Sequence, residues 1–89
     1  MNPNPPKFVM GSQIRAARAL LGWRREDLAT AANLHPNAVS YWEKRAELPS
    51  RTEPSACKRM RQALAGAGIV TVNSPAPGVC LTGCKLVLR

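Results

Sequence analysis

Apolar residues recur every three or four positions in four stretches of the chain, which is the spacing of helices that bury one face. Each stretch is short, and a turn or a proline separates it from the next. The pattern predicts four helices, over residues 12–21, 24–32, 36–45 and about 53 to 67. After Gly68 the helical period ends.

Residues at the ends of the first three stretches support these bounds. Ser12 can cap the first helix, and Gly22 can end it, because glycine adopts the left-handed conformation that closes helices. Asn33 can close the second helix for the same reason. Pro36 fits the first position of the third helix, with His35 as the residue that caps it.

β-branched and apolar residues replace the helical pattern in the last part of the chain. Residues 69–73 (IVTVN) and 79–81 (VCL) predict two strands around a turn at 74–78, and 85–88 (KLVL) predicts a third. An exposed apolar strand near a chain end tends to pair with a partner. We therefore expect residues 69–89 to form a C-terminal β-strand extension that serves as a dimerisation element.

The rest of the chain fits one small domain preceded by an arm. Residues 1–10 contain three prolines and no periodic pattern, so they predict a flexible N-terminal arm. The helical stretches define a domain over residues 11–68. A chain of 89 residues has a thin core. Since no disulfide or metal is expected to support that core, we expect the chain to form a homodimer.

The charge points to a polyanionic partner. The chain carries 13 Lys and Arg against 5 Asp and Glu, a formal net charge of +8. Residues 1–49 are net +3 and residues 50–89 are net +5, so the excess is not confined to a tail. Such a surface attracts DNA, RNA or anionic lipid, and the predominance of arginine favours phosphate oxygens and base edges. The basic residues of the fourth helix, Lys58, Arg59 and Arg61, are expected to form a solvated face.

Composition argues against catalysis, cofactors and membranes. One His, one Asp and no nucleophile–base pair leave no candidate active site, so the protein is not expected to be an enzyme. No run of apolar residues is long enough to cross a membrane, and no signal peptide is visible, so a cytoplasmic location is expected. The cysteines at 57, 80 and 84 do not have metal-ligand spacing, and Cys57 fits a core position.

Two short helices joined by the turn Ala32-Asn33-Leu34-His35 predict a helix-turn-helix. The third helix would then enter the major groove of duplex DNA with its polar face toward the bases. Asn37 can bond adenine bidentately, Ser40 can bond several bases, and Tyr41 can bond a base or pack on a thymine methyl. Arg25 would bring a charge and a helix N-terminus to a phosphate. Further phosphate candidates are Arg15, His35, Lys44, Arg45 and Arg51.

The stretch IRAARALLGWRREDLATAANLHPNAVSYWEKR resembles the phage-repressor-like (Xre-type) class of helix-turn-helix transcriptional regulators. The resemblance covers residues 11–68. It implies a mainly α fold, a compact four-helix, lambda-repressor-like bundle, here followed by a short β-hairpin. It also implies dimers that bind pseudo-palindromic operators. The markers of the class are Arg18, Gly22, Asp27, Leu28, Ala29, Val39, Trp42 and Glu43.

The resemblance assigns roles to individual positions. It implies a buried, structural ion pair between Arg18 and Glu43. It places base reading on Pro36, Asn37, Ser40 and Tyr41, and a phosphate contact on Arg25, where the class often has Gln.

Three positions depart from the class pattern. Asn33 stands where the class has the turn glycine, a replacement that the turn tolerates. Arg45 stands where the class has the glycine that ends the third helix, so a longer helix is expected. Pro36 has no side-chain donor, so readout at that position rests on shape or van der Waals contact.

The sequence thus predicts a dimeric, sequence-specific regulator of transcription that binds double-stranded DNA. Repression by steric occlusion is expected, with dual activation and repression as a further mode. The two third helices would lie about 34 Å apart. Deletion of residues 74–89 would weaken dimerisation and operator affinity together. The alternative is a protein-interaction module on the same fold, such as an antitoxin or anti-activator. RNA binding is not favoured, because the sequence lacks the exposed aromatic platform that single-strand recognition uses.

Overall fold

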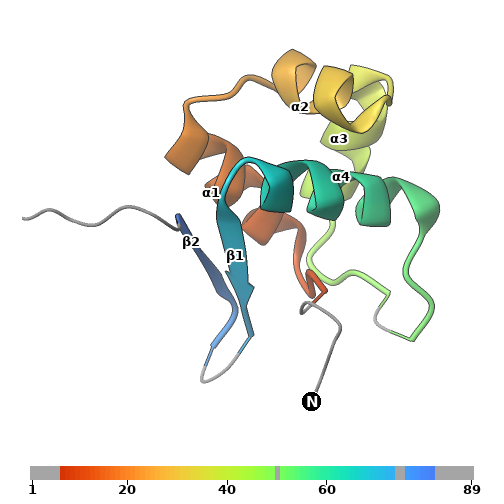
Figure 1. Ribbon diagram of the computed structural model, residues 1–89. Coiled ribbons are helices and arrows are strands. Elements are labelled where there is room, and N and C mark those ends of the chain that lie inside the picture. Colours follow the sequence, from red (N-terminus) through yellow and green to blue (C-terminus); the bar gives the residue numbers. More distant parts are fainter. Residues whose placement is uncertain (1–6, 50, 74–75, 82–89) are drawn as a thin grey trace, which may run out of the picture.

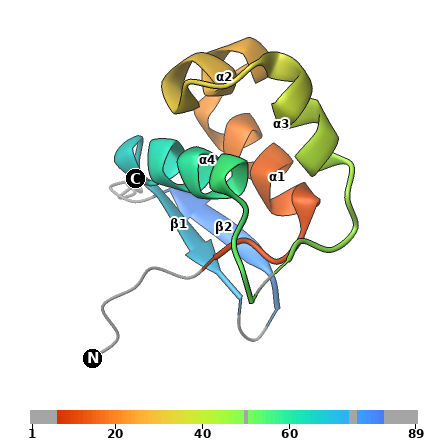
Figure 2. The same cartoon turned by 90° about the vertical axis from the view of Figure 1, so that its right-hand side faces the viewer.

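A computed structural model describes residues 7–49, 51–73 and 76–81, which form a helical bundle with a hairpin on one side (Figure 1). The helix α1 contacts α3, α4 and the strand β2, and α4 contacts β1, so the hairpin packs against both α1 and α4 (Figure 2). This arrangement confirms the predicted fold class. The elements in chain order are α1 (Gly11–Leu21), α2 (Arg25–Ala32), α3 (Pro36–Glu43), α4 (Ser55–Gly66), β1 (Ile69–Val72) and β2 (Gly78–Leu81).

Backbone conformations at the helix ends follow the sequence signals closely. Gly22 (φ 70°) and Asn33 (φ 59°) end α1 and α2 in the left-handed conformation. Asn33 is the one non-glycine residue with positive φ in the described part of the chain. His35 caps α3, since its Nδ1 accepts a hydrogen bond of 3.0 Å from the backbone N–H of Asn37. The α2–turn–α3 unit is therefore fixed at both ends of its turn by local interactions.

The start of α1 differs from the prediction. The helix begins at Gly11 with Met10 in the cap position, so Ser12 is not the cap. The reason is the side chain of Gln13, whose Oε1 accepts from the backbone N–H groups of Val9 (2.7 Å) and Met10 (3.1 Å). The side chain of Gln13, at the third helical position, thus caps the N-terminus of α1 in place of Ser12.

The end of α3 also differs. The helix ends at Glu43, two residues before the expected end at Arg45, and Lys44 follows in a right-handed conformation. The backbone N–H of Gly11 donates to the carbonyl oxygen of Arg45 at 3.0 Å. A Cβ atom on Gly11 would lie 2.6 Å from the carbonyl oxygens of Arg45 and Glu43. The N-terminus of α1 therefore closely approaches the backbone after α3, and its first N–H gives the Arg45 carbonyl a partner without a longer helix.

The core lies among the four helices and the inner face of the hairpin. Ile14, Val39, Leu28, Met60 and Leu64 are its largest fully buried side chains. The thiol of Cys57 belongs to the same core, as the sequence predicts. Trp23 and Trp42 are half-buried and pack against the core.

The strands β1 and β2 pair antiparallel, with Val70 opposite Cys80 and Thr71 opposite Val79. Ile69 and Thr71 are buried toward the bundle, whereas Val70 and Cys80 are exposed on the outer face. The hairpin predicted after Gly68 is thus present. The expected third strand at residues 85–88 lies outside the described residues.

A buried glutamine joins the hairpin to α1. The Nε2 of Gln13 donates to the carbonyl oxygens of Val72 and Gly78, both at 3.2 Å, and to Oδ1 of Asn73 at 2.9 Å. With the two bonds that its Oε1 accepts, Gln13 uses both ends of its amide on three separate segments. It is 3% exposed, so these bonds replace those that water would make.

The expected flexible arm does not extend to residue 10. Phe8 is buried in the core, and Leu48 donates a backbone hydrogen bond of 3.0 Å to Val9. Asn73 donates from Nδ2 to the carbonyl oxygen of Lys7 at 2.7 Å. These contacts fix residues 7–10 because burial of the Phe8 ring offsets the entropy of ordering them. Residues 1–6 of the predicted arm lie outside the described residues.

Candidate nucleic-acid interface

The helix α3 presents one polar face to solvent beside the N-terminus of α2. Its opposite face carries Val39, which is fully buried, and Glu43, which is 4% exposed. Asn37 and Tyr41 are exposed on the outer face, and Ser40 is half-buried there. The sequence expectation that these three side chains share a face is confirmed, whereas Pro36 contributes only a half-buried ring at the start of the helix.

An ion pair fixes α3 against α1. Arg18 donates to the carboxylate of Glu43 from Nε (2.5 Å) and from Nη2 (3.1 Å), and its Nη1 donates to the carbonyl oxygen of Trp23 (2.9 Å). The Glu43 side chain is 3% exposed and that of Arg18 is 14% exposed. This bidentate pair is the one that the resemblance implies. It sets the orientation of α3, since a buried carboxylate held on two donors has little freedom to move.

Arg25 belongs to the same charge network but remains accessible. Its Nε lies 3.6 Å from Oε1 of Glu43, and its side chain is 53% exposed. One carboxylate therefore faces two guanidinium groups, while Glu26 and Asp27 of the first turn offset the other basic charge at the start of α2. The exposed guanidinium of Arg25 lies beside the positive end of the helix dipole, where its free donors can reach a phosphate.

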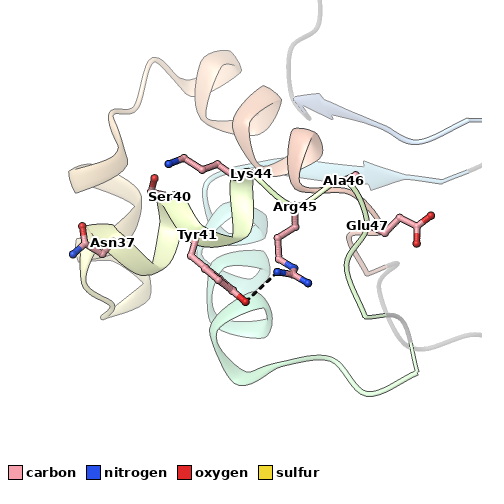
Figure 3. A pocket seen from close by; sticks show the side chains of 7 residues that line it. All are labelled: Asn37, Ser40, Tyr41, Lys44, Arg45, Ala46 and Glu47. Atoms are coloured by element: carbon pink, nitrogen blue, oxygen red, sulfur yellow. Dashed lines mark hydrogen bonds between the residues drawn. The ribbon is translucent and has the colours of Figure 1, made fainter.

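The exposed face of α3 borders a surface hollow of about 860 Å³ (Figure 3). The side chains of α3 and of the segment after it enclose the hollow, and most of them can donate hydrogen bonds. They are Asn37, Ser40, Tyr41, Lys44, Arg45, Ala46 and Glu47.

A second hollow, of about 540 Å³, lies between α3 and the start of α2. Asn37 and Ser40 line both hollows, so the two form one continuous surface along α3. The remaining residues of the second hollow are Arg18, Trp23, Arg24, Arg25, Glu26 and Pro36.

The predicted phosphate contacts fall into two groups. Arg25, Lys44 and Arg45 line the hollows beside the α3 face. His35 is exposed at the N-terminus of α3, with Nδ1 engaged in the cap. Arg15 on α1 and Arg51 before α4 are exposed but line neither hollow.

Arg45 contacts the side chain of Tyr41 from the segment after α3. Its Nη1 donates to the Tyr41 hydroxyl oxygen at 3.0 Å, and its guanidinium carbon lies 5.2 Å from the centre of that ring (Figure 3). The Tyr41 ring in turn meets the ring of Trp42 edge to face, at 4.9 Å between centroids. Trp42 packs against the core. The conformation of Tyr41 is therefore restrained from two sides.

The basic residues of α4 do not form a single solvated face. Arg61 is 12% exposed and donates to both carboxylate oxygens of Glu53, at 2.8 and 2.9 Å. This hydrogen bonding raises the pKa of Arg61. Lys58 and Arg59 are exposed, and Arg59 donates to the carbonyl oxygen of Asn33 at 3.3 Å. The expectation for Arg61 is wrong because Glu53, eight residues earlier, folds back onto it.

Sequence reasoning missed two residues that position the interface. Gly11 allows α1 to approach the end of α3, and Gln13 ties α1 to the hairpin. The signal for Gln13 is its place one turn before Ala17, on the apolar side of the helix, where a polar residue needs buried partners. Nothing in the sequence distinguishes Gly11 from a glycine in a loop.

The described residues contain no group of three or more His, Cys, Asp or Glu side chains placed to hold a metal ion. Among them, no helix is both long enough and apolar enough to span a membrane. The chemistry of the α3 surface is that of neutral donors and acceptors flanked by basic groups. Such a surface can bond base edges and neutralise phosphates.

Comparison with known proteins agrees with this geometry. The family model described as "Helix-turn-helix" matches residues 14–55. The matched range contains α2, α3 and all but the first three residues of α1, together with Arg18, Glu43 and the exposed face of α3. No curated protein matches the chain.

Proposed function

Residues 14–55 of this chain belong to the phage-repressor-like (Xre-type) family of helix-turn-helix DNA-binding regulators, and from that premise we propose a specific role. The protein is a dimeric repressor that binds a pseudo-palindromic operator through α3 in the major groove. The observation that carries the proposal is the exposed face of α3, which holds Asn37, Ser40 and Tyr41 while the opposite face is locked by the Arg18–Glu43 pair.

The proposed base contacts follow from side-chain chemistry. The Asn37 amide offers a donor and an acceptor, the pattern that adenine bonds bidentately, and Ser40 and Tyr41 offer hydroxyl groups. Pro36 contributes van der Waals contact at the start of α3. The Asn37 side chain is exposed on this face, so its amide is accessible to DNA.

The proposed phosphate contacts flank the base-reading residues. Arg25 and His35 lie at the N-termini of α2 and α3, where the helix dipoles favour an anion. Lys44 and Arg45 lie beyond the other end of α3. Arg15 and Arg51 extend this set as more distant contacts. The net charge of +8 supports the proposal, because neutralised phosphates release counterions on binding.

The proposed dimer uses residues 69–89. The inner face of the hairpin packs on α1, so its outer face, with Val70 and Cys80, is the part open to a second copy. The hairpin and α3 lie on opposite sides of α1 in both views (Figures 1 and 2). Pairing through the hairpin therefore leaves the α3 surface free for DNA. Occupancy of an operator by such a dimer represses by excluding the polymerase.

Selection from a random duplex DNA pool, with the full chain at near-physiological salt, tests the proposal. A two-fold symmetric motif with half-sites about one helical turn apart is expected. Absence of enrichment, with affinity for all duplexes that fades as salt rises, would contradict sequence-specific regulation. That outcome would favour a protein-interaction module on the same fold.

A further inference from the structure

We propose that Arg45 determines base preference through Tyr41, by holding the Tyr41 hydroxyl so that it donates a hydrogen bond to the DNA. This inference rests on the proposed function. It concerns a residue that the sequence places at the end of the third helix. In the structure α3 ends at Glu43, so Arg45 lies in the segment that follows the helix.

The hydrogen bond between the two side chains has a defined direction. A guanidinium group has donors and no acceptor, so Arg45 must donate and the hydroxyl oxygen of Tyr41 must accept. The hydroxyl proton of Tyr41 then points away from Arg45. Since Tyr41 is 54% exposed and lines the hollow beside α3, that proton is free to bond a group that enters the hollow (Figure 3).

The contact also fixes where the hydroxyl lies. Arg45 sits over the ring of Tyr41 at 5.2 Å, and its guanidinium carbon is 5.9 Å from the centre of the Trp42 ring. Trp42 is half-buried and packs against the core, so the cluster Tyr41–Trp42–Arg45 connects the exposed hydroxyl to the packed side of α3. A side chain restrained before binding loses less conformational entropy when it meets its target.

The direction of the bond predicts which base edges Tyr41 prefers. A hydroxyl donor is satisfied by the N7 and O6 atoms of guanine, by N7 of adenine and by O4 of thymine in the major groove. The cytosine edge presents a donor there, which would compete with Arg45 for the hydroxyl oxygen of Tyr41. Arg45 is thus a positioning residue for base reading, in addition to the phosphate role proposed for its charge.

A double-mutant cycle on the selected operator separates the two roles of Arg45. The variants are Arg45→Met, Tyr41→Phe and the double variant, with Lys44→Met as the matched control. Lys44→Met removes the same charge from the adjacent position, and the Lys44 side chain makes no hydrogen bond to Tyr41 among the described residues. Each variant is titrated against the operator, against operators changed at single positions, and against unrelated duplex DNA.

We expect Lys44→Met to weaken all duplexes alike. Arg45→Met is expected to reduce the ratio of operator to unrelated-DNA affinity about tenfold. Tyr41→Phe should lower the ratio to a similar extent and at the same base position, and the double variant should lose no more of it. Two results would overturn the inference and leave the proposed function intact. One is a double variant in which the two tenfold losses of the affinity ratio multiply. The other is an Arg45→Met affinity profile equal to that of Lys44→Met. Failure of the unmodified chain to prefer any operator would overturn both.

Discussion

The first residue of α1 is bonded to the segment that follows α3: the backbone N–H of Gly11 lies 3.0 Å from the carbonyl oxygen of Arg45. The two helix termini therefore meet at backbone level, with no side chain between them. Together with the Arg18–Glu43 pair, this contact gives α3 two anchor points on α1. The exposed face of α3 is oriented by the helix that lies beneath it.

Gly11→Ala should loosen this contact. Its Cβ would lie 2.6 Å from two carbonyl oxygens of the backbone around the end of α3, so α1 or the end of α3 must move. We expect a loss of about 1–3 kcal/mol in the free energy of unfolding, as for other overpacked sites, and weaker DNA binding. Gly66→Ala is the control, because its Cβ would meet nothing within 4 Å. Equal unfolding free energies for the two variants, by urea titration, would contradict the close approach.

Gln13→Leu should release the hairpin from α1. The variant leaves the carbonyl oxygens of Val72 and Gly78 without their amide donor, and the N–H groups of Val9 and Met10 without their acceptor. We expect a loss of about 2–4 kcal/mol in unfolding free energy. Amide hydrogen exchange in β1 should accelerate. Gln62→Leu, on the exposed side of α4, should change stability by about 0.5 kcal/mol at most. A Gln13→Leu protein as stable as that control would show that Gln13 does not hold the hairpin.

Alkaline pH should destabilise the fold through Cys57. Burial, with a smaller contribution from Glu53, raises the pKa of the Cys57 thiol from 9.0 to about 11. Because the folded state holds this proton more tightly, the contribution is complete below pH 9 and is lost as the pH rises toward 11. It amounts to about 2–3 kcal/mol. Denaturant titrations between pH 8 and pH 11 should show a steeper loss for the unmodified chain than for Cys57→Ala. Parallel profiles would refute the assignment.

Val70→Glu should separate dimerisation from folding. Val70 is 41% exposed on the outer face of the hairpin, so a carboxylate there leaves the monomer core intact. In the proposed dimer it would place like charges at a shared face, and both self-association and operator affinity should fall. Deletion of residues 74–89 is a weaker test, because it also removes β2 and its contacts with α1. Sedimentation of Val70→Glu as a dimer of normal affinity would exclude this face from the interface.

The sequence predicted what depends on short-range patterns. Helical spacing, the left-handed ends at Gly22 and Asn33 and the His35 cap are each determined within a few residues, and all are present. The contacts of Gly11 with Arg45 and of Gln13 with Asn73 join segments 34 and 60 residues apart. No local pattern encodes such pairs, so the start of α1 and the end of α3 were predicted wrongly.

For the candidate interface too, the sequence predicted the features set by local spacing and missed those set by contacts between distant segments. The helical period placed Asn37, Ser40 and Tyr41 on one face, and the structure exposes all or part of each. The Arg45–Tyr41 contact was not predicted, since it depends on the path of the chain after α3. The sequence predicts Arg61 as part of a solvated face, but in the fold Glu53 lies beside Arg61 and forms an ion pair with it.

The central claim is that α3 reads bases while the residues around it contact phosphates. The most direct test compares Asn37→Ala with Arg25→Ala for affinity to the selected operator and to unrelated duplexes over a range of salt. Asn37→Ala should cost about 1–3 kcal/mol on the operator and relax its base preference, with little change on unrelated DNA. Arg25→Ala should weaken all duplexes alike and reduce the salt slope by about one. If the two variants had the same profile, α3 would not be the base-reading element and the account would be wrong.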